Sequence, residues 1–186
     1  MATTVAPDIV QKRLAHSKVV YLDNENVLID SGPQSEWDEL QTFLDAQGSV
    51  DTLFLSHAHG DHIGNADLVA ETYDCEVLFP ENEPFDDVPL SEEDVTRVSN
   101  GTELGSDARV IEVPGHTEGI CAVHAPERRV LLATDVLDGS DRCGLPAGYL
   151  LPPPAIYNWD SDKAATNIAD LLDRTFETVV VTHGSN

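Results

Sequence analysis

Short apolar runs, separated by polar and turn-rich segments, recur along the whole chain. The runs at 18–23 and 26–30 flank Asn24-Glu25 and predict two strands joined by a tight turn. Further runs of strand length stand at 51–56, 75–79, 109–113, 120–124, 129–133 and 178–182. Turn-forming pairs such as Pro114-Gly115 and Ala125-Pro126 separate neighbouring runs, which supports reading them as distinct strands.

Apolar residues at helical spacing mark three other segments. They cover 35–46, 64–73 and 161–174. Ser35 is the predicted N-cap of the first helix and Gly48 its stop, while Ser161 is the predicted N-cap of the last. Because strands alternate with helices and with hairpins alike, the pattern predicts an α/β fold with mixed sheets.

Two long segments lack a strong periodic pattern. Residues 80–100 are rich in Pro, Asp and Glu and are interpreted as a surface excursion, with a short helix near 91–98. Residues 137–158 form a long predicted loop that carries Tyr149, Tyr157 and three consecutive prolines. Its aromatic side chains, with Trp159, either line a substrate site or cover the edge of a sheet.

The length of 186 residues predicts a single domain spanning 1–186, large enough for a sizeable core. No apolar run approaches the ~20 residues that a membrane span requires, so a membrane partner is not expected. Residues 1–8 lack the basic start and apolar core of a signal peptide, which predicts a cytoplasmic protein. The sequence leaves monomer and homodimer open.

The charge balance is strongly acidic, with 34 Asp and Glu against 10 Lys and Arg and a formal net charge of −24. The acids are scattered along the chain, as on the surfaces of proteins adapted to high salt, where self-repulsion is screened. We therefore expect a halophilic source, with an ordinary acidic protein as the alternative. No basic patch is present to bind phosphates, so a nucleic-acid partner is not expected.

The three cysteines are far apart and odd in number, and no CxxC pair occurs. The pattern indicates neither a disulfide framework nor a thiolate zinc site. Cys121 lies in an apolar strand-like run and is expected to be buried. Cys143 lies in a loop rich in Gly and Pro and is expected to be exposed.

A dense cluster of metal-ligating side chains directly follows the apolar run that ends near Leu55. His57, His59, Asp61 and His62 stand within six residues, and they include three of the chain's seven histidines. Clustered imidazoles and a carboxylate would be costly to desolvate together without a cation. The cluster therefore predicts a metal site.

Three other candidate ligands each follow a predicted strand. His116 comes after the strand ending at 113, Asp135 after 129–133, and His183 after 178–182. Side chains at the same ends of packed strands can converge on one point. Together with the cluster they provide five imidazoles and two carboxylates, enough for two metal ions. Such donors suit zinc, and iron or manganese would also be accepted.

Two divalent cations, two carboxylates and a bridging hydroxide would leave a local charge of about +1, which can attract a substrate despite the acidic surface. Cations of this kind lower the pKa of bound water to ~7 and polarise a carbonyl or phosphoryl oxygen. The composition of the site thus predicts a hydrolase with a small-molecule substrate.

The chain resembles the metallo-β-lactamase superfamily in five ordered motifs. They are NVLIDSG at 26–32, HxHxDH at 57–62, PGHT at 114–117, Thr134-Asp135 and Thr182-His183-Gly184. The resemblance implies a four-layer αβ/βα sandwich of two mixed sheets flanked by helices, with the site at one edge. It implies that His57, His59 and His116 hold one metal, that Asp61, His62 and His183 hold the second, and that Asp135 bridges them. Asp61 and Asp135 would thereby be the catalytic carboxylates, and Asp30 would brace the site by hydrogen bonding.

Within the superfamily, SHAHGDHIGN at 56–65 and PGHTEG at 114–119 are most similar to the glyoxalase II-like branch of hydroxyacylglutathione hydrolases and small thioesterases. The resemblance implies a binuclear hydrolase, with two Zn²⁺ ions, acting on a small thioester, ester or lactone. The sequence ends three residues after His183, without the C-terminal helical domain that binds glutathione in that branch, so glutathione thioesters are not the expected substrates.

Two alternatives remain open on the sequence. A mononuclear iron oxygenase, similar to the persulfide dioxygenases that resemble glyoxalase II, would use only some of the seven ligands. A non-catalytic metal-binding sensor would use the same scaffold without turnover.

Overall fold

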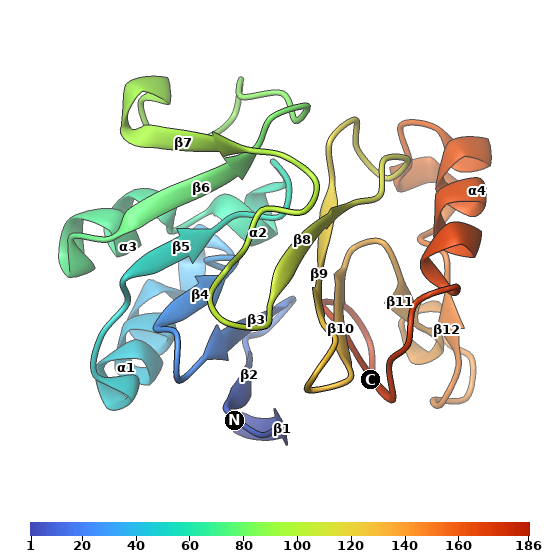
Figure 1. Ribbon diagram of the computed structural model, residues 1–186, viewed down its shortest axis with the longest axis horizontal. Coiled ribbons are helices and arrows are strands. Elements are labelled where there is room, and N and C mark those ends of the chain that lie inside the picture. The colour runs from blue at the N-terminus through green and yellow to red at the C-terminus, as the bar shows by residue number, and fades with distance from the viewer. The chain divides into compact units, whose positions relative to one another are not determined.

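A computed structural model describes the whole chain, residues 1–186, which divides into two compact units (Figure 1). The N-terminal unit is Met1–Val98 and the C-terminal unit is Ser99–Asn186. Each unit has its own mixed β-sheet and its own cluster of buried apolar side chains. The expected α/β class with mixed sheets is therefore confirmed, whereas the single domain over 1–186 stays a prediction.

The N-terminal unit is built on a seven-stranded sheet in the order β1-β2-β3-β4-β5-β6-β7. Strands β1 to β4 pair antiparallel, and β4 to β7 pair parallel. The bounds are β1 Ala2–Ala6, β2 Ile9–Arg13, β3 Lys18–Leu22, β4 Val27–Ile29, β5 Thr52–Phe54, β6 Glu76–Pro80 and β7 Val95–Val98. The parallel strands end at the same edge, and the loop that follows β5 carries the histidine cluster.

Helices connect the parallel strands of this unit (Figure 1). They are α1 Trp37–Gln47 between β4 and β5, and α2 Gly60–Ile63 and α3 Ala66–Tyr73 between β5 and β6. Helix α1 buries Leu40, Phe43 and Leu44 in the core, as its apolar spacing predicts. Gly48 ends this helix with a φ of 109°, and its N–H donates to the carbonyl of Leu44.

Several local predictions for this unit are corrected by the structure. Ser35 does not cap α1, because a short 3-10 helix, η1 Gln34–Glu36, precedes it. The excursion 80–100 contains only a 3-10 turn, η2 Glu92–Asp94, and ends in strand β7 rather than in a helix. The hairpin of β1 and β2 was not expected, since β1 is largely exposed and shows no apolar alternation.

The C-terminal unit is built on a four-stranded sheet in the order β13-β10-β9-β8. Strand β10 pairs parallel with β13, while β8, β9 and β10 pair antiparallel in sequence order. The bounds are β8 Arg109–Glu112, β9 Cys121–Ala125, β10 Val130–Thr134 and β13 Thr178–Val181. Strands β8, β10 and β13 therefore run in one direction, and their carboxyl ends lie at one edge of the sheet.

Helix α4 Ser161–Leu171 packs on this sheet through Ile168 and Leu171 (Figure 1). Its N-cap is Asp160, whose carboxylate accepts a hydrogen bond from the N–H of Lys163, and not Ser161 as predicted. The helix also ends earlier than the predicted boundary at 174. The predicted loop 137–158 contains short elements, namely β11 Asp138–Gly139, η3 Ser140–Cys143, β12 Leu150–Leu151 and η4 Ala155–Tyr157.

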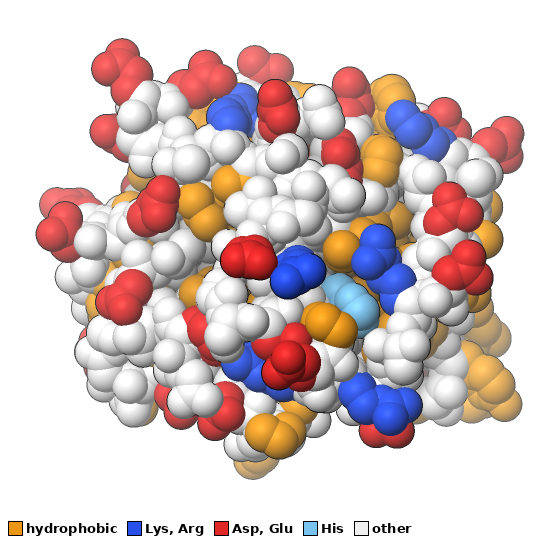
Figure 2. All heavy atoms as spheres, in the orientation of Figure 1, with side chains coloured by type: hydrophobic (Ala, Val, Ile, Leu, Met, Phe, Trp, Pro, Cys, Tyr) orange, Lys and Arg blue, Asp and Glu red, His pale blue; other side chains and the backbone are white.

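Acidic side chains are scattered over the face of the protein shown in Figure 2, in keeping with the formal net charge of −24. Dispersed acids of this kind repel one another at low ionic strength and are screened by salt. None of the helices combines the length and the apolar character needed to cross a membrane.

Candidate metal centre

The histidine cluster of the N-terminal unit folds into a tight loop and one helical turn. His62 and Ile63 donate their backbone N–H groups to the carbonyl of His59, which closes α2 directly behind that residue. The His57 ring centroid lies 4.7 Å from that of His59 and 4.1 Å from that of His62. His57 and His62 are fully buried, whereas His59 and Asp61 are more accessible to solvent. The structure therefore brings the three predicted imidazoles of this unit together.

Asp30 braces this loop from the end of β4, as the sequence predicts. Its Oδ1 accepts the backbone N–H of Ser56 at 2.8 Å, and its Oδ2 accepts the hydroxyl of the same residue at 3.0 Å. Oδ2 also lies 2.8 Å from Nδ1 of His62. Because an ionised carboxylate only accepts, Nδ1 carries the hydrogen and Nε2 keeps its lone pair for a metal ion.

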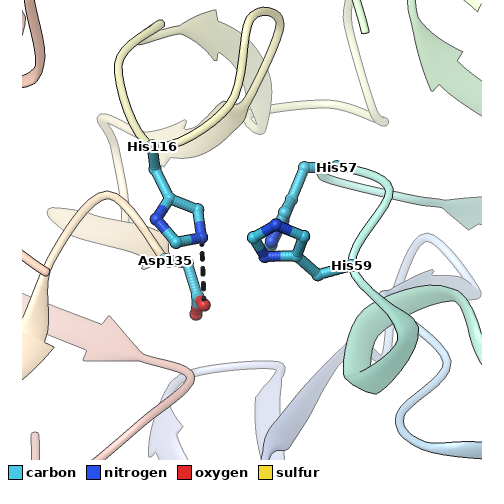
Figure 3. Close-up of side chains that lie close together, drawn as sticks. All are labelled: His57, His59, His116 and Asp135. Atoms are coloured by element: carbon cyan, nitrogen blue, oxygen red, sulfur yellow. Dashed lines mark ion pairs between the residues drawn. The ribbon is translucent and has the colours of Figure 1, made fainter. Parts of the chain in front are cut away.

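The predicted ligands of the C-terminal unit meet around one carboxylate. Oδ2 of Asp135 lies 3.2 Å from Nε2 of His183 and 3.6 Å from Nε2 of His116. Figure 3 shows the second of these contacts as a dashed line. His183 follows β13, His116 follows β8 and Asp135 follows β10. The carboxyl ends of these strands share one edge of the sheet. All three side chains are buried, so the charge of Asp135 is held in a region with little water.

Asn158 orients His116 and was not identified from the sequence. Its Oδ1 lies 3.2 Å from Nδ1 of His116, and its amide nitrogen donates to the carbonyl of Pro153. That second bond assigns Oδ1 as the acceptor, so Nδ1 of His116 is the donor and Nε2 is available as a ligand. The backbone N–H of Trp159 donates to the carbonyl of His116 at 2.9 Å. The end of the long loop thus holds the histidine in place.

Gly115 allows the backbone that precedes His116 to pack directly against helix α4. Its φ is 149°, and a Cβ at this position would overlap the backbone N and Cα of Ala164. The N–H of Asp160 donates to the carbonyl of Gly115, which fixes the same approach. Only glycine combines this backbone geometry with such close packing.

We expect Gly115→Ala to lower the free energy of unfolding by at least about 2 kcal/mol, because the added methyl group must displace α4 or the loop. Metal affinity should fall as well, since His116 is the next residue. Urea unfolding and metal titration would measure the two effects. Gly144→Ala is the matched control, because it also has a positive φ, of 74°, but meets nothing within 4 Å. Equal losses in the two variants would contradict the packing argument.

A partly buried ion pair lies close in sequence to Asp135. Arg142 donates to both oxygens of Asp138 at 2.8 and 2.7 Å, and its guanidinium lies over the ring of Tyr157 at 5.6 Å. Burial raises the pKa of the Asp138 carboxyl, while the guanidinium of Arg142 acts in the opposite direction. The pair anchors the start of the long loop in this unit.

The aromatic side chains of this loop do not cover the sheet. Tyr149, Tyr157 and Trp159 are 69%, 52% and 53% exposed. Packing on a sheet edge would have buried these side chains. The structure therefore does not support the interpretation that they cover the edge of a sheet. Contact with a substrate remains a prediction.

No cysteine belongs to the candidate ligand groups. Cys121 is buried and Cys143 is exposed, as predicted, and all three cysteines are free thiols. Cys75 is partly buried, and desolvation raises its pKa to about 11. The three thiols therefore differ widely in accessibility.

At pH 8 we expect one cysteine, Cys143, to react rapidly with a disulfide reagent such as DTNB. The Cys75 thiolate is a fraction of only about 10⁻³ at this pH, because its pKa of about 11 lies well above it. Stopped-flow absorbance would count the fast equivalents. The Cys143→Ser variant should lose the fast phase, and a fast phase that survives would show that another thiol is accessible.

Known proteins share both the sequence pattern and the fold. A family model described as the metallo-beta-lactamase superfamily matches residues 13–183. An uncharacterized protein of Aquifex aeolicus is 30% identical over 150 residues, covering 68% of this chain and 67% of that protein. A hydroxyacylglutathione hydrolase of Rhodopseudomonas palustris is 35% identical over 99 residues, covering 50% of this chain and 37% of that enzyme.

Among solved structures, the crystal structure of TTHA1623 in a di-iron-bound form superposes with a TM-score of 0.66 and 22% identity. The match covers 100% of this chain and 92% of that one. At this identity the likeness shows the fold, and it confirms the fold class expected from the sequence.

Proposed function

Because the chain belongs to the metallo-beta-lactamase superfamily, we propose that it is a binuclear metal-dependent hydrolase of a small thioester, ester or lactone. The observation that carries this proposal is the set of seven nitrogen and oxygen ligands at strand ends. Four come from one loop of the N-terminal unit, and three meet at one sheet edge of the C-terminal unit.

We assign one metal ion to His57, His59, His116 and Asp135, and the second to Asp61, His62 and His183. In this assignment Asp135 would be shared between the two ions, which is supported by the 3.2 Å distance between its Oδ2 and Nε2 of His183. Imidazole and carboxylate donors without thiolates fit zinc, iron or manganese, and we propose two Zn²⁺ ions.

Two divalent cations would supply a water of lowered pKa and would polarise the scissile carbonyl. The chain's own residues prepare the site for this chemistry. Asp30 fixes the tautomer of His62, and Asn158 fixes that of His116, so that Nε2 of each ring is the free ligand atom. The carboxylates of Asp61 and Asp135 balance part of the cation charge. The remaining positive charge attracts an electron-rich carbonyl within an otherwise acidic protein.

A thioester is the first candidate substrate, because hydroxyacylglutathione hydrolases are among the relatives. The match covers only 37% of the Rhodopseudomonas palustris enzyme, so the thiol part of the substrate is a separate question.

The proposal is tested by metal analysis of protein purified at its native salt concentration, followed by a panel of thioesters, lactones, carboxylic esters and phosphodiesters. We expect about two metal ions per chain and turnover of a thioester or lactone that chelation abolishes and zinc restores. One iron per chain with oxygen consumption on a persulfide would instead support the oxygenase alternative. Bound metal with no turnover on any substrate would support a sensor.

A further inference from the structure

A pocket of about 400 Å³ in the N-terminal unit opens beside the proposed metal centre. It is lined by Gln34, Ala58, His59, Gly60, Ile63, Gly64, Asp87 and Pro89. His59 is one of the proposed metal ligands, so a substrate whose scissile bond lies at the metals can extend a substituent into this pocket. The pocket volume is within the range of known small-molecule sites, so the pocket can hold a small organic substituent.

The lining has a distinct chemical character. Ala58, Ile63 and Pro89 are apolar, two glycines present backbone, and Gln34 offers a neutral amide. Asp87 is the only acidic residue, and no lysine or arginine lines the pocket. An anionic substituent would therefore meet a carboxylate without any cation to compensate it.

A hydrogen bond links the segment that carries Asp87 to the histidine loop, residues 57–62. The buried carboxylate of Glu83 accepts the backbone N–H of Ala58 at 2.9 Å, between two proposed ligands. Arg97 donates to the carbonyls of Pro80 and Glu83 at 2.9 and 3.0 Å. Its guanidinium also pairs with Glu92, so this arginine is already engaged and does not offset the charge of Asp87.

We propose that this pocket receives one end of the substrate, and that Asp87 selects uncharged or cationic substituents over anionic ones. The inference rests on the proposed hydrolase function and specifies its substrate class. It separates the expected substrates from thioesters of carboxylate-bearing thiols such as glutathione. The positive metal centre would bind the carbonyl, while the carboxylate of Asp87 would favour uncharged or cationic groups attached to that carbonyl.

The test uses the zinc-loaded full-length protein and two series of small thioesters. One series varies the charge of the thiol part (acetyl esters of thiocholine, mercaptoethanol and mercaptopropionate), and the other varies the charge of the acyl part. For each series we divide kcat/KM for the cationic ester by kcat/KM for the anionic ester. In one of the two series we expect this ratio to fall roughly tenfold in Asp87→Asn, and further in Asp87→Lys. Comparing ratios between variants cancels the intrinsic reactivity of each ester.

Asp86→Asn is the matched control, because it removes the same charge from the exposed neighbouring position that does not line the pocket. Its effect on the ratio should be clearly smaller. Unchanged ratios for Asp87→Asn in both series, or equal changes in the two variants, would overturn the inference and leave the hydrolase proposal standing.

If no thioester, ester or lactone is turned over, the hydrolase proposal fails and the charge preference is still measurable by binding. Cobalt-loaded protein would be titrated with cysteamine, mercaptoethanol and mercaptopropionate, with thiolate-to-cobalt absorption as the signal. We expect the preference for cysteamine over mercaptopropionate to shrink in Asp87→Asn. If the ratio of the affinities for cysteamine and mercaptopropionate is the same in the unmodified protein and in Asp87→Asn, the role of Asp87 is overturned.

Discussion

Replacing Asp135 with alanine is expected to lower kcat/KM by about 10³-fold or more while the fold persists. The carboxylate lies 3.2 and 3.6 Å from two imidazole nitrogens, and in the proposed centre it would be a ligand shared by the two metal ions. Its loss would remove a shared ligand and leave positive charge uncompensated in a buried region. Steady-state kinetics and elemental analysis of the purified variant would measure the loss of turnover and of metal.

The control is Asp173→Ala, which removes the same charge from an exposed position just beyond α4. It should retain normal turnover and metal content. Circular dichroism of both variants should match that of the unmodified protein. Full activity in the Asp135→Ala protein would show that this carboxylate is not part of the reaction centre.

Asp30→Ala is expected to lower the free energy of unfolding of the metal-free protein by about 3 kcal/mol, and metal affinity by about 10- to 100-fold. The buried carboxylate holds three groups, namely the N–H and the hydroxyl of Ser56 and Nδ1 of His62. Alanine would leave these groups without their acceptor. Its φ of 62° at this position is also unfavourable for a residue whose side chain cannot hydrogen-bond locally.

Asp30→Asn separates the stability effect from the metal effect. Asparagine tolerates the positive φ and can still accept the N–H of Ser56 through Oδ1. Its amide nitrogen then faces His62 and donates to Nδ1, which moves the ring hydrogen to Nε2 and blocks that ligand atom. We expect most of the stability to remain while metal affinity falls. Urea unfolding and chelator competition would measure both, and unchanged metal affinity would contradict the tautomer argument.

The parts of the fold that follow local rules were predictable from the sequence. The β3–β4 hairpin and the stop of α1 at Gly48 depend on turn chemistry and apolar spacing, and both are present. The β1–β2 hairpin and strand β7 were missed because β1 and β7 give no strong apolar alternation, and β7 pairs with β6 across the segment 81–94. The two N-caps were each misassigned by one residue, because a 3-10 turn precedes α1 and because the neighbouring Asp160 caps α4.

The candidate ligands were predictable because each lies in the segment that follows an apolar strand, and the end of a strand limits where the following side chains can lie. The supporting residues were harder to find. Asn158 and Glu83 contact His116 and Ala58 across separations of 42 and 25 residues, and neither belongs to a recognisable motif. Such contacts depend on the path of a long loop, which local propensity does not determine.

We propose that the seven ligands hold a common pair of metal ions. Anomalous diffraction at the zinc absorption edge, on crystals of the zinc-loaded protein, tests it most directly. We expect two anomalous peaks, each with ligands from both the histidine loop and the His116, Asp135 and His183 group. A single peak, or ions bound by the residues of one unit alone, would contradict it.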